Sequence, residues 1–362
     1  MSDTVNNVMG PTLLERRGAI RQLDGHVTGC AIARDSQQVA FVTAEGDIVL
    51  ADRADWERAD AWNVQTVHDG AILSVAPDAA LTGFLTGGDD NALRRIATDG
   101  AVSDLVQGRR WIEHVTTWCD AKGKGGVIAF ASGKQVELRD AGGHATLKVL
   151  EHPSTVSGIV FDAKGKRIAA AHYNGASMWF VQAKVDTVRP LEWKGSHIGI
   201  AIHPAGEALV TSMQESELHG WRLSDGHNMR MSGYPSKVQS MAFTHNGRWL
   251  VTSGADTIVM WPFFGGGPMG KPPAEAGGIP GVTCTRVACH PVHDIVAAGF
   301  ADGSVLMADT AAQRVLPVCM GGGGAVTALA FSPDGCGLAF GTEDGRAAVV
   351  DLSARAENSP QA

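Results

Sequence analysis

Charged residues, tyrosine and cysteine are scarce in this chain of 362 residues. Charged residues make up 19% and hydrophobic residues 44%, proportions that exclude a largely disordered chain. Acidic residues outnumber basic ones by 38 to 30, and a net charge of −8 argues against binding to phosphates through basic patches. We therefore expect a folded protein that does not bind nucleic acid.

Paired cysteine motifs and long hydrophobic runs are missing as well. The six cysteines include no CxxC pair, so we expect buried free thiols rather than a disulfide framework. No apolar stretch approaches the roughly 18 residues that a membrane span needs, and residues 1–17 lack the basic and apolar regions of a secretory signal. These absences predict a cytoplasmic protein with no membrane contact.

What the sequence does contain is a repeat. The clearest copy is near the end of the chain, where residues 326–331 alternate between apolar and small or polar side chains and lead into the turn Ser-Pro-Asp-Gly at 332–335. A second strand at 338–340, a turn at 343–345 and a third strand at 347–351 follow. Short strands joined by short turns are typical of an antiparallel meander.

The same pattern recurs upstream at a regular interval. The turn between second and third strands lies near residues 46, 91, 133, 175, 216, 256, 303 and 345. The mean spacing of about 43 residues is that of a four-stranded propeller blade. We therefore predict an all-β fold, a single closed β-propeller of four-stranded antiparallel blades, with eight blades favoured and seven as the alternative.

The two ends of the repeat array are unequal. The last copy has no fourth strand after it, whereas a spare strand at residues 12–23 precedes the first copy. Pairing the two would hide the sheet edges, so we expect the ring to be closed by the N-terminal strand. The predicted organisation is one propeller domain at 12–353 between flexible tails at 1–11 and 354–362.

Residues 325–335, Ala-Val-Thr-Ala-Leu-Ala-Phe-Ser-Pro-Asp-Gly, carry a family resemblance. Together with Trp221 and Trp261 in the third strands and four closing aspartates, they make the chain resemble the WD-repeat β-propeller family; the aspartates are Asp52, Asp140, Asp309 and Asp351. No copy has a complete Trp-Asp dipeptide. The resemblance implies a non-enzymatic scaffold or adaptor that binds a protein or peptide partner and needs no cofactor.

The family's buried Asp-His-Ser/Thr-Trp tetrad supplies a structural reading for several polar residues. His occurs at the family's offset only as His68 and His152, and Thr86 and Asp90 complete the set for His68. The same residue types could form a catalytic triad, but a triad is defined by geometry and roles rather than by a residue list. The sequence has no G-x-S-x-G nucleophile elbow, so we predict structural tetrads and no enzyme.

Metal and phosphate sites are not predicted either. His203, His245 and His290 occupy the turn after the first strand in three copies, where we expect them to cap exposed turns. HExxH and paired-cysteine spacings are absent. The glycine runs at 265–267 and 321–324 lack the Lys and Ser/Thr of a phosphate-binding loop.

The predicted partner surface is the top face, which we define as the loops leading into the first strands together with the turns between second and third strands. Residues there that turn geometry does not require are candidates for binding a partner: Asp24, His26, Asp69, Asp89, Ile112, His114, Tyr173, Lys194 and Lys237. The loop at Phe263–Phe264 is the second choice. We expect the basic pairs 94–95 and 109–110 to be solvated or paired with Asp89 and Asp104, and the protein to be a monomer.

An alternative function remains open at this stage. The alternative is a propeller hydrolase or lactonase with a metal ion in the central channel. Such a site requires carboxylates or imidazoles that point inward from different blades. In this sequence the plausible set is Asp24, His26, Asp69 and His114.

Overall fold

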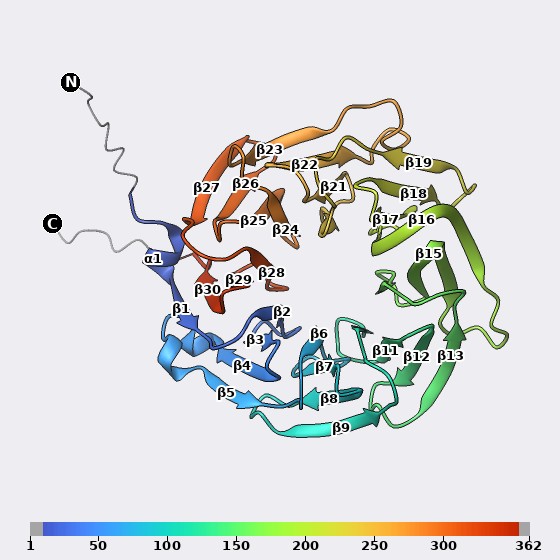
Figure 1. Cartoon of the computed structure of the whole chain (residues 1–362), viewed down its shortest axis with the longest axis horizontal. Helices are drawn as coiled ribbons and strands as arrows, with labels where there is room; N and C mark the ends of the chain where they lie inside the picture. Colours follow the sequence, from blue (N-terminus) through green and yellow to red (C-terminus); the bar gives the residue numbers. More distant parts are fainter. Residues whose placement is uncertain (1–9, 355–362) are drawn as a thin grey trace.

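A computed structural model describes residues 10–354, whose strands form seven antiparallel sheets around a central opening (Figure 1). Six of these sheets have four strands and one has six. The helical elements of the described residues are short: α1 (Leu13–Arg17), η1 (Arg53–Asp55) and η2 (Ala59–Ala61). Of the predicted tails, residues 1–9 and 355–362 lie outside the described part of the chain.

Five of the four-stranded sheets are consecutive meanders, in which each strand pairs with the next. The first two contain β2 (Val27–Ile32), β3 (Gln38–Thr43), β4 (Asp47–Asp52) and β5 (Asn63–Thr66), and β6 (Ile72–Pro77), β7 (Phe84–Gly88), β8 (Ala92–Ile96) and β9 (Val102–Gln107). The third contains β10 (His114–Trp118), β11 (Val127–Ser132), β12 (Gln135–Asp140) and β13 (Thr146–Glu151). The later two contain β20 (Met241–Phe243), β21 (Trp249–Thr252), β22 (Thr257–Pro262) and β23 (Ala274–Gly278), and β24 (Cys284–Cys289), β25 (Ile295–Phe300), β26 (Val305–Asp309) and β27 (Arg314–Cys319).

The six-stranded sheet corrects the expected blade number. It contains β14 (Gly158–Phe161), β15 (Arg167–Phe180), β16 (Arg189–Ile202), β17 (Ala208–Met213), β18 (Leu218–Arg222) and β19 (Asn228–Met231). Two sequence copies fall in this one sheet because β15 and β16 each run for 14 residues. The prediction of eight separate four-stranded blades is therefore wrong, and the fold is an all-β propeller of seven blades, one of them enlarged.

The fusion has a local cause. Residues 174–175, where a turn was expected, lie within β15 as a register shift between Tyr173 and Gly175. β16 likewise passes from its pairing with β15 to its pairing with β17 without leaving extended structure, with a second irregularity after His197. A bulge accommodates one extra residue while the ladder continues, so the sequence period persists although the sheet is not interrupted.

The N-terminal segment is shorter as a strand than predicted. Thr12 caps α1, since its side chain accepts the Glu15 amide while Glu15 accepts the Thr12 amide in return. This capping box keeps residues 13–17 helical. Only β1 (Gly18–Gln22) is extended, and it pairs with β30 (Arg346–Asp351) in a sheet completed by β29 (Gly337–Thr342) and β28 (Val326–Phe331).

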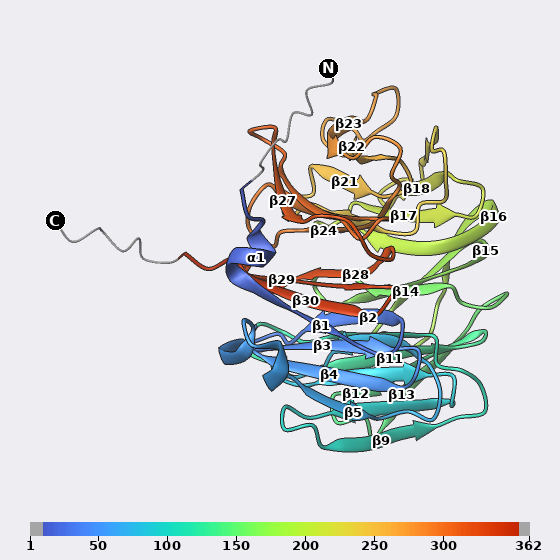
Figure 2. The ribbon, with the colours of Figure 1, turned by 60° about the vertical axis from the view of Figure 1, so that its left-hand side comes forward.

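The core lies between neighbouring sheets, which stack side by side around the ring (Figure 2). Second strands are the most deeply placed; every residue of β3 and of β29 is buried. Fourth strands such as β9 and β13 are mostly exposed and form the outer wall. Leu85 from one sheet and Phe130 from the next share one apolar cluster, an arrangement that each sheet requires because it cannot bury its faces alone.

Hydroxyls of the first strands tie successive units together near the central opening. Thr28 donates to the Ile72 carbonyl at 2.6 Å, and Thr285 donates to the Val326 carbonyl at 2.7 Å. Thr327 donates to the Val27 carbonyl at 2.5 Å, which joins the end of the chain to its beginning. These bonds satisfy backbone carbonyls between sheets and fix the spacing of neighbouring first strands.

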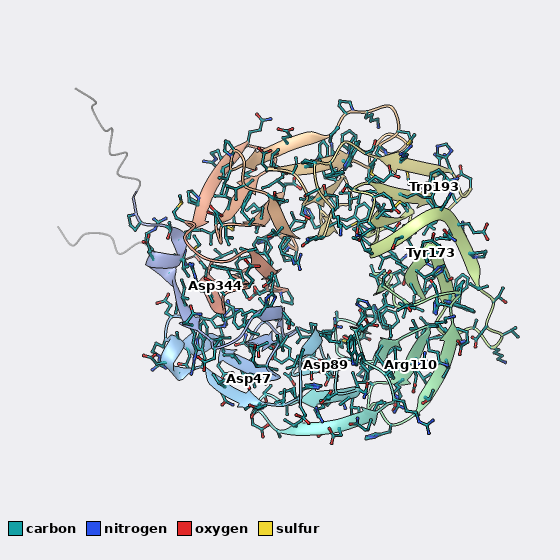
Figure 3. The ribbon with its side chains drawn as sticks, in the orientation of Figure 1. Asp47, Asp89, Arg110, Tyr173, Trp193 and Asp344 are labelled. Carbon is teal, nitrogen blue, oxygen red and sulfur yellow. The ribbon has the colours of Figure 1, made fainter. Side chains whose placement is uncertain are left out.

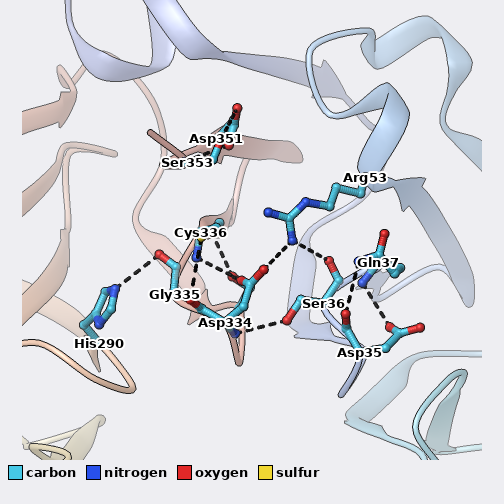
Figure 4. A network of polar contacts seen from close by, with 12 residues as sticks. Asp35, Ser36, Gln37, Arg53, His290, Asp334, Gly335, Cys336, Asp351 and Ser353 are labelled. Atoms are coloured by element: carbon cyan, nitrogen blue, oxygen red, sulfur yellow. Dashed lines mark hydrogen bonds and ion pairs between the residues drawn. The ribbon is translucent and has the colours of Figure 1, made fainter. Parts of the chain in front are cut away.

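A second set of links lies on the face opposite the top face, and it corrects the prediction for His203. This side chain is only 6% exposed and its Nε2 donates to the Gly247 carbonyl of the following unit at 2.9 Å. His290 is equally buried and donates to the Gly335 carbonyl at 3.2 Å. Figure 4 shows this contact next to the Arg53–Asp334 ion pair at 2.5 Å. Nδ1 of His203 accepts from the Ala205 amide, and Nδ1 of His290 accepts from the Val292 and His293 amides. Both histidines therefore cap their own turns as expected, but from buried positions that also link neighbouring units.

The link at His203 makes a sharp prediction for Gly247. Gly247 has φ +70° and a Cβ there would lie 2.2 Å from the His203 Nε2, whereas Gly226 has φ +76° with open space around it. Gly247→Ala and Gly226→Ala therefore share the left-handed strain of about 1–2 kcal/mol, but only Gly247→Ala also displaces His203. We expect Gly247→Ala to lower the free energy of unfolding by about 1–3 kcal/mol more in urea titrations. Equal losses in the two variants would contradict the link.

Candidate partner-binding face

The top face is assembled by the register of each blade. Val27 of the first strand pairs with Thr43 at the end of the second strand, and Ile72 pairs with Gly88 in the next blade. The loop before a first strand therefore meets the turn after a second strand at the same end of the sheet. Residues of this face such as Asp89, Arg110, Tyr173 and Asp344 lie at different positions around the ring (Figure 3).

The structure brings His68, Thr86 and Asp90 together. His68 Nδ1 lies 2.9 Å from the Asp90 carboxylate and Nε2 lies 2.8 Å from the Thr86 hydroxyl, with His68 3% and Thr86 0% exposed. Burial lowers the pKa of His68 and outweighs the opposing effect of Asp90. Burial opposes ionisation of Asp90 too, but hydrogen bonds from His68 and Arg94 lower its pKa to about 2. A hydroxyl without solvent access cannot meet a substrate, so this set locks the loop in place.

Related sets occur in other units with different residues. Tyr234 occupies the histidine position, bonding the Thr252 hydroxyl at 2.6 Å and accepting from Trp261 Nε1 at 2.7 Å. Burial raises the pKa of Tyr234 to about 12. His197 lies 2.7 Å from the Thr211 hydroxyl, although it is four residues past the expected position at Trp193. The sequence rule therefore found the His68 set and missed the substituted ones, whose shared signal is a buried Thr in the second strand.

His152 belongs to a different arrangement from the one predicted. Its Nδ1 lies 3.2 Å from the Lys134 carbonyl, and its Nε2 accepts from Trp179 Nε1 at 3.4 Å. The hydroxyl of this unit, Ser177, bonds His172 instead, at 2.9 Å. Burial lowers the pKa of His152, so the ring is neutral where it accepts the indole proton.

The nine candidate partner residues differ in accessibility. Six are exposed: Asp24, His26, Asp69, Tyr173, Lys194 and Lys237. Asp89 is half-buried and its carboxylate occupies space left by Gly70, where a Cβ would lie 2.2 Å from the Asp89 Oδ1. Ile112 is 1% exposed and packs between two sheets, so it is a core residue that a partner cannot reach.

His114 is half-buried at the start of β10. Burial lowers its pKa to about 4, so the imidazole is neutral over the physiological range. His114 therefore does not change charge near neutrality.

The candidates for a channel metal do not form a site. Within residues 10–354, no group of three or more His, Cys, Asp or Glu side chains is placed to hold a metal ion. The set Asp24, His26, Asp69 and His114 is therefore not brought together as ligands. None of the helices described is long and apolar enough to cross a bilayer.

The two basic pairs behave differently from one another. Arg94 pairs with Asp90 at 2.5 Å and with Asp104 at 2.7 Å, and Arg95 pairs with Asp78 at 2.6 Å. Arg109 and Arg110 are exposed and make no ion pair with any described residue. The first basic pair, 94–95, is therefore ion-paired, and the second, 109–110, is solvated.

The loop at Phe263–Phe264 is packed against its own surroundings. The Phe263 ring lies 4.9 Å from Phe243, and the Phe264 ring lies 5.2 Å from Trp249. Arg248 and Lys271 cover the Phe264 ring. Phe264 nevertheless stays 39% exposed, so most of the loop's aromatic surface is already used.

Comparisons with known proteins agree with this architecture. Residues 226–261 match the family described as WD domain, G-beta repeat, and residues 287–357 match the Anaphase-promoting complex subunit 4 WD40 domain. The Telomerase protein component 1 of Mus musculus is 22% identical over 292 residues, which cover 77% of this chain but 10% of that protein. The computationally designed Ika8 protein superposes with a TM-score of 0.71 at 17% identity, over 92% of this chain and 99% of that one, a likeness in fold alone.

The ring of antiparallel sheets and the recurring buried hydroxyls define a β-propeller built from tetrad-type repeats. Two WD-repeat family models match parts of the chain and, with the propeller fold, support a relationship to the WD-repeat family. WD-repeat propellers serve in general as protein-interaction scaffolds, and the family is typically non-enzymatic.

Proposed function

We propose that this propeller is a non-enzymatic scaffold that binds a protein or peptide partner on its top face. The observation that carries the proposal is Tyr173, an aromatic side chain that is 56% exposed on a rigid backbone. Its amide donates to the Ser154 hydroxyl at 2.9 Å and its carbonyl lies 3.0 Å from the His172 Nδ1. An exposed tyrosine with a fixed backbone loses little entropy on binding and is a common interface anchor.

Charged neighbours give this anchor a polar rim. Tyr173 pairs with Ser196 in the ladder, so the exposed Lys194 lies close to it at the same edge. Asp24, His26 and Asp69 extend the exposed polar surface across the first two blades. An exposed aromatic with exposed polar groups on the same face suits a protein surface better than a small molecule, which needs an enclosing cavity.

The proposal predicts a loss of binding without a loss of folding. The variant His26→Ala/His114→Ala/Tyr173→Ala should keep the wild-type melting temperature within a few degrees, because two of these side chains are exposed and the third is half-buried. Its affinity for the principal partner should fall by about 30-fold or more, since a few anchors carry most of the binding energy. Partner recovery from the native host, followed by titration of the recovered partner, measures both.

A matched control uses three exposed residues of the opposite face, in the variant Lys122→Ala/Lys164→Ala/His245→Ala. This variant should retain the partner. If the control loses the partner while the top-face variant retains it, the binding surface lies on the opposite face and the proposal is wrong.

A further inference from the structure

A cleft opens between the second and third blades at the rim of the top face. Its volume is about 620 Å³, within the range of ligand-binding pockets. The walls come from Val106 in β9, from the loop residues Gly108, Arg109 and Arg110, and from β11, β12 and the end of β13. Ile112 and Phe130 lie at the base of the cleft but are almost fully buried, so they close it without offering contact surface.

The rim of the cleft carries cations without acidic partners. Arg109, Arg110 and Lys134 are all exposed, and no described residue forms an ion pair with them. Of the two carboxylates of the lining, Glu137 pairs with Arg139 at 2.8 Å, whereas Glu151 accepts only from the neutral Gln135 at 2.5 Å. Three cations without acidic partners therefore face one carboxylate without a cation, so the net charge of the cleft is positive on a protein whose net charge is −8.

The basic loop is held in position before any ligand arrives. The Gly108 amide donates to the Asn91 carbonyl at 2.8 Å, and the Ile112 amide donates to the Gly88 carbonyl at 3.0 Å. Gly133 has φ +61°, and a Cβ there would lie 2.8 Å from the Arg110 Nη1, so the glycine leaves room for the guanidinium. Both ends of the loop are thus anchored on the β7–β8 turn, next to the His68 set.

We propose that this cleft binds an acidic, extended peptide segment of a partner protein. Carboxylates of the segment pair with Arg109, Arg110 and Lys134. Trp111, which is 56% exposed in the same loop, adds aromatic surface beside the rim. Guanidinium groups bind carboxylates with two parallel hydrogen bonds, and a preorganised loop reduces the entropic cost of that binding.

The observations favour a peptide over a nucleic acid. The basic group is confined to three side chains on a protein whose net charge is −8, whereas nucleic-acid binding uses a more extended basic surface. This inference rests on the proposed function, because it names a class of partner, but it does not use Tyr173 or the other residues of the triple variant.

The test is a selection of random twelve-residue peptides displayed on phage against the full chain. We expect the enriched sequences to combine Asp or Glu with one large apolar residue. A synthetic enriched peptide should bind the variant Arg109→Glu/Arg110→Glu about 30-fold or more weakly than wild type, measured by fluorescence anisotropy. Its affinity should also fall as salt is raised, since exposed charges are screened.

The matched control is Lys184→Glu/Arg189→Glu, which changes the net charge equally at two exposed residues elsewhere. It should bind the peptide within about two-fold of wild type. The triple variant His26→Ala/His114→Ala/Tyr173→Ala should do the same. If the cleft variant binds the peptide like wild type, the cleft proposal is wrong but the top-face proposal is unaffected. If only the triple variant loses the native partner, that result supports the top-face proposal and not the cleft proposal.

Three outcomes would overturn the cleft proposal. The first is no enrichment, or enrichment of peptides without acidic residues. The second is an enriched acidic peptide that binds both charge-reversal variants alike. The third is binding of a labelled oligo(dT) that depends on Arg109 and Arg110 while no peptide binds. That result would assign the cleft to nucleic acid.

Discussion

Removal of residues 1–22 should turn a monodisperse protein into an unfolded or aggregating one. β1 pairs with β30 through five residue pairs, and its loss leaves that strand with a free edge. Leu13 and Leu14 are 9% and 5% exposed and pack with Val318, Phe340 and Val350. Each buried leucine contributes about 2–5 kcal/mol, against a total stability of about 5–15 kcal/mol. Size-exclusion chromatography and thermal melting measure the effect.

The control for this truncation is removal of residues 1–9 alone, which leaves α1 and β1 intact. That variant should elute and melt like the wild type. A point variant separates the two contributions: Leu14→Ala should lower the free energy of unfolding by about 2–5 kcal/mol while keeping β1. A fully folded, monomeric protein after removal of 1–22 would show that β30 does not need its partner.

Acidification from pH 6.5 towards pH 4 should destabilise the protein steeply. Burial lowers the pKa of His68, His152, His197 and His219 below the usual value, and His219 falls to about 4. The unfolded chain binds protons at these groups near pH 6.5 while the folded chain does not, so the free energy of unfolding falls as pH falls through this window. For His219 alone the difference is about 3 kcal/mol, because each pKa unit is worth about 1.4 kcal/mol. Stability is fully present above pH 6.5. Urea titrations at several pH values measure the slope.

One variant isolates the contribution of His219 to this pH dependence. His219 stacks on Trp193 with ring centroids 3.8 Å apart, and its Nδ1 is buried without a hydrogen-bond partner. His219→Phe keeps the stacking and removes the titrating group. The slope of the free energy of unfolding against pH should therefore decrease by the contribution of about one proton. His227→Gln, at an exposed position, should leave the slope unchanged. If His219→Phe has the wild-type slope, that imidazole is not kept neutral by burial.

The repeat and the WD-type strands could be read from sequence because they depend on local pattern. Alternation within residues 326–331 and the turn at 332–335 specify strand and turn chemistry without long-range information. The number of sheets could not be read in this way. Whether Tyr173 to Gly175 forms a turn or a bulge within a longer strand depends on pairing with β16, which is distant in sequence.

Side-chain roles were predictable only where a known spacing applied. His68 and Thr86 met at the expected offset, whereas Tyr234 and His197 perform similar roles from positions that the spacing does not predict. The burial of His203 and Ile112 arises from the neighbouring unit, so a pattern read within one copy could not reveal it. The paired state of Arg94 and the unpaired state of Arg110 depend in the same way on tertiary contacts.

The central claim is that the top face, including its basic cleft, binds a protein partner. The most direct measurement is quantitative partner recovery from the native host with wild type, the top-face triple variant, Arg109→Glu/Arg110→Glu and the opposite-face control, all verified as folded. We expect one principal partner to be recovered by wild type and by the control, and to be depleted with the triple variant and with the charge reversal. Equal recovery of the same partner by all four proteins would contradict it.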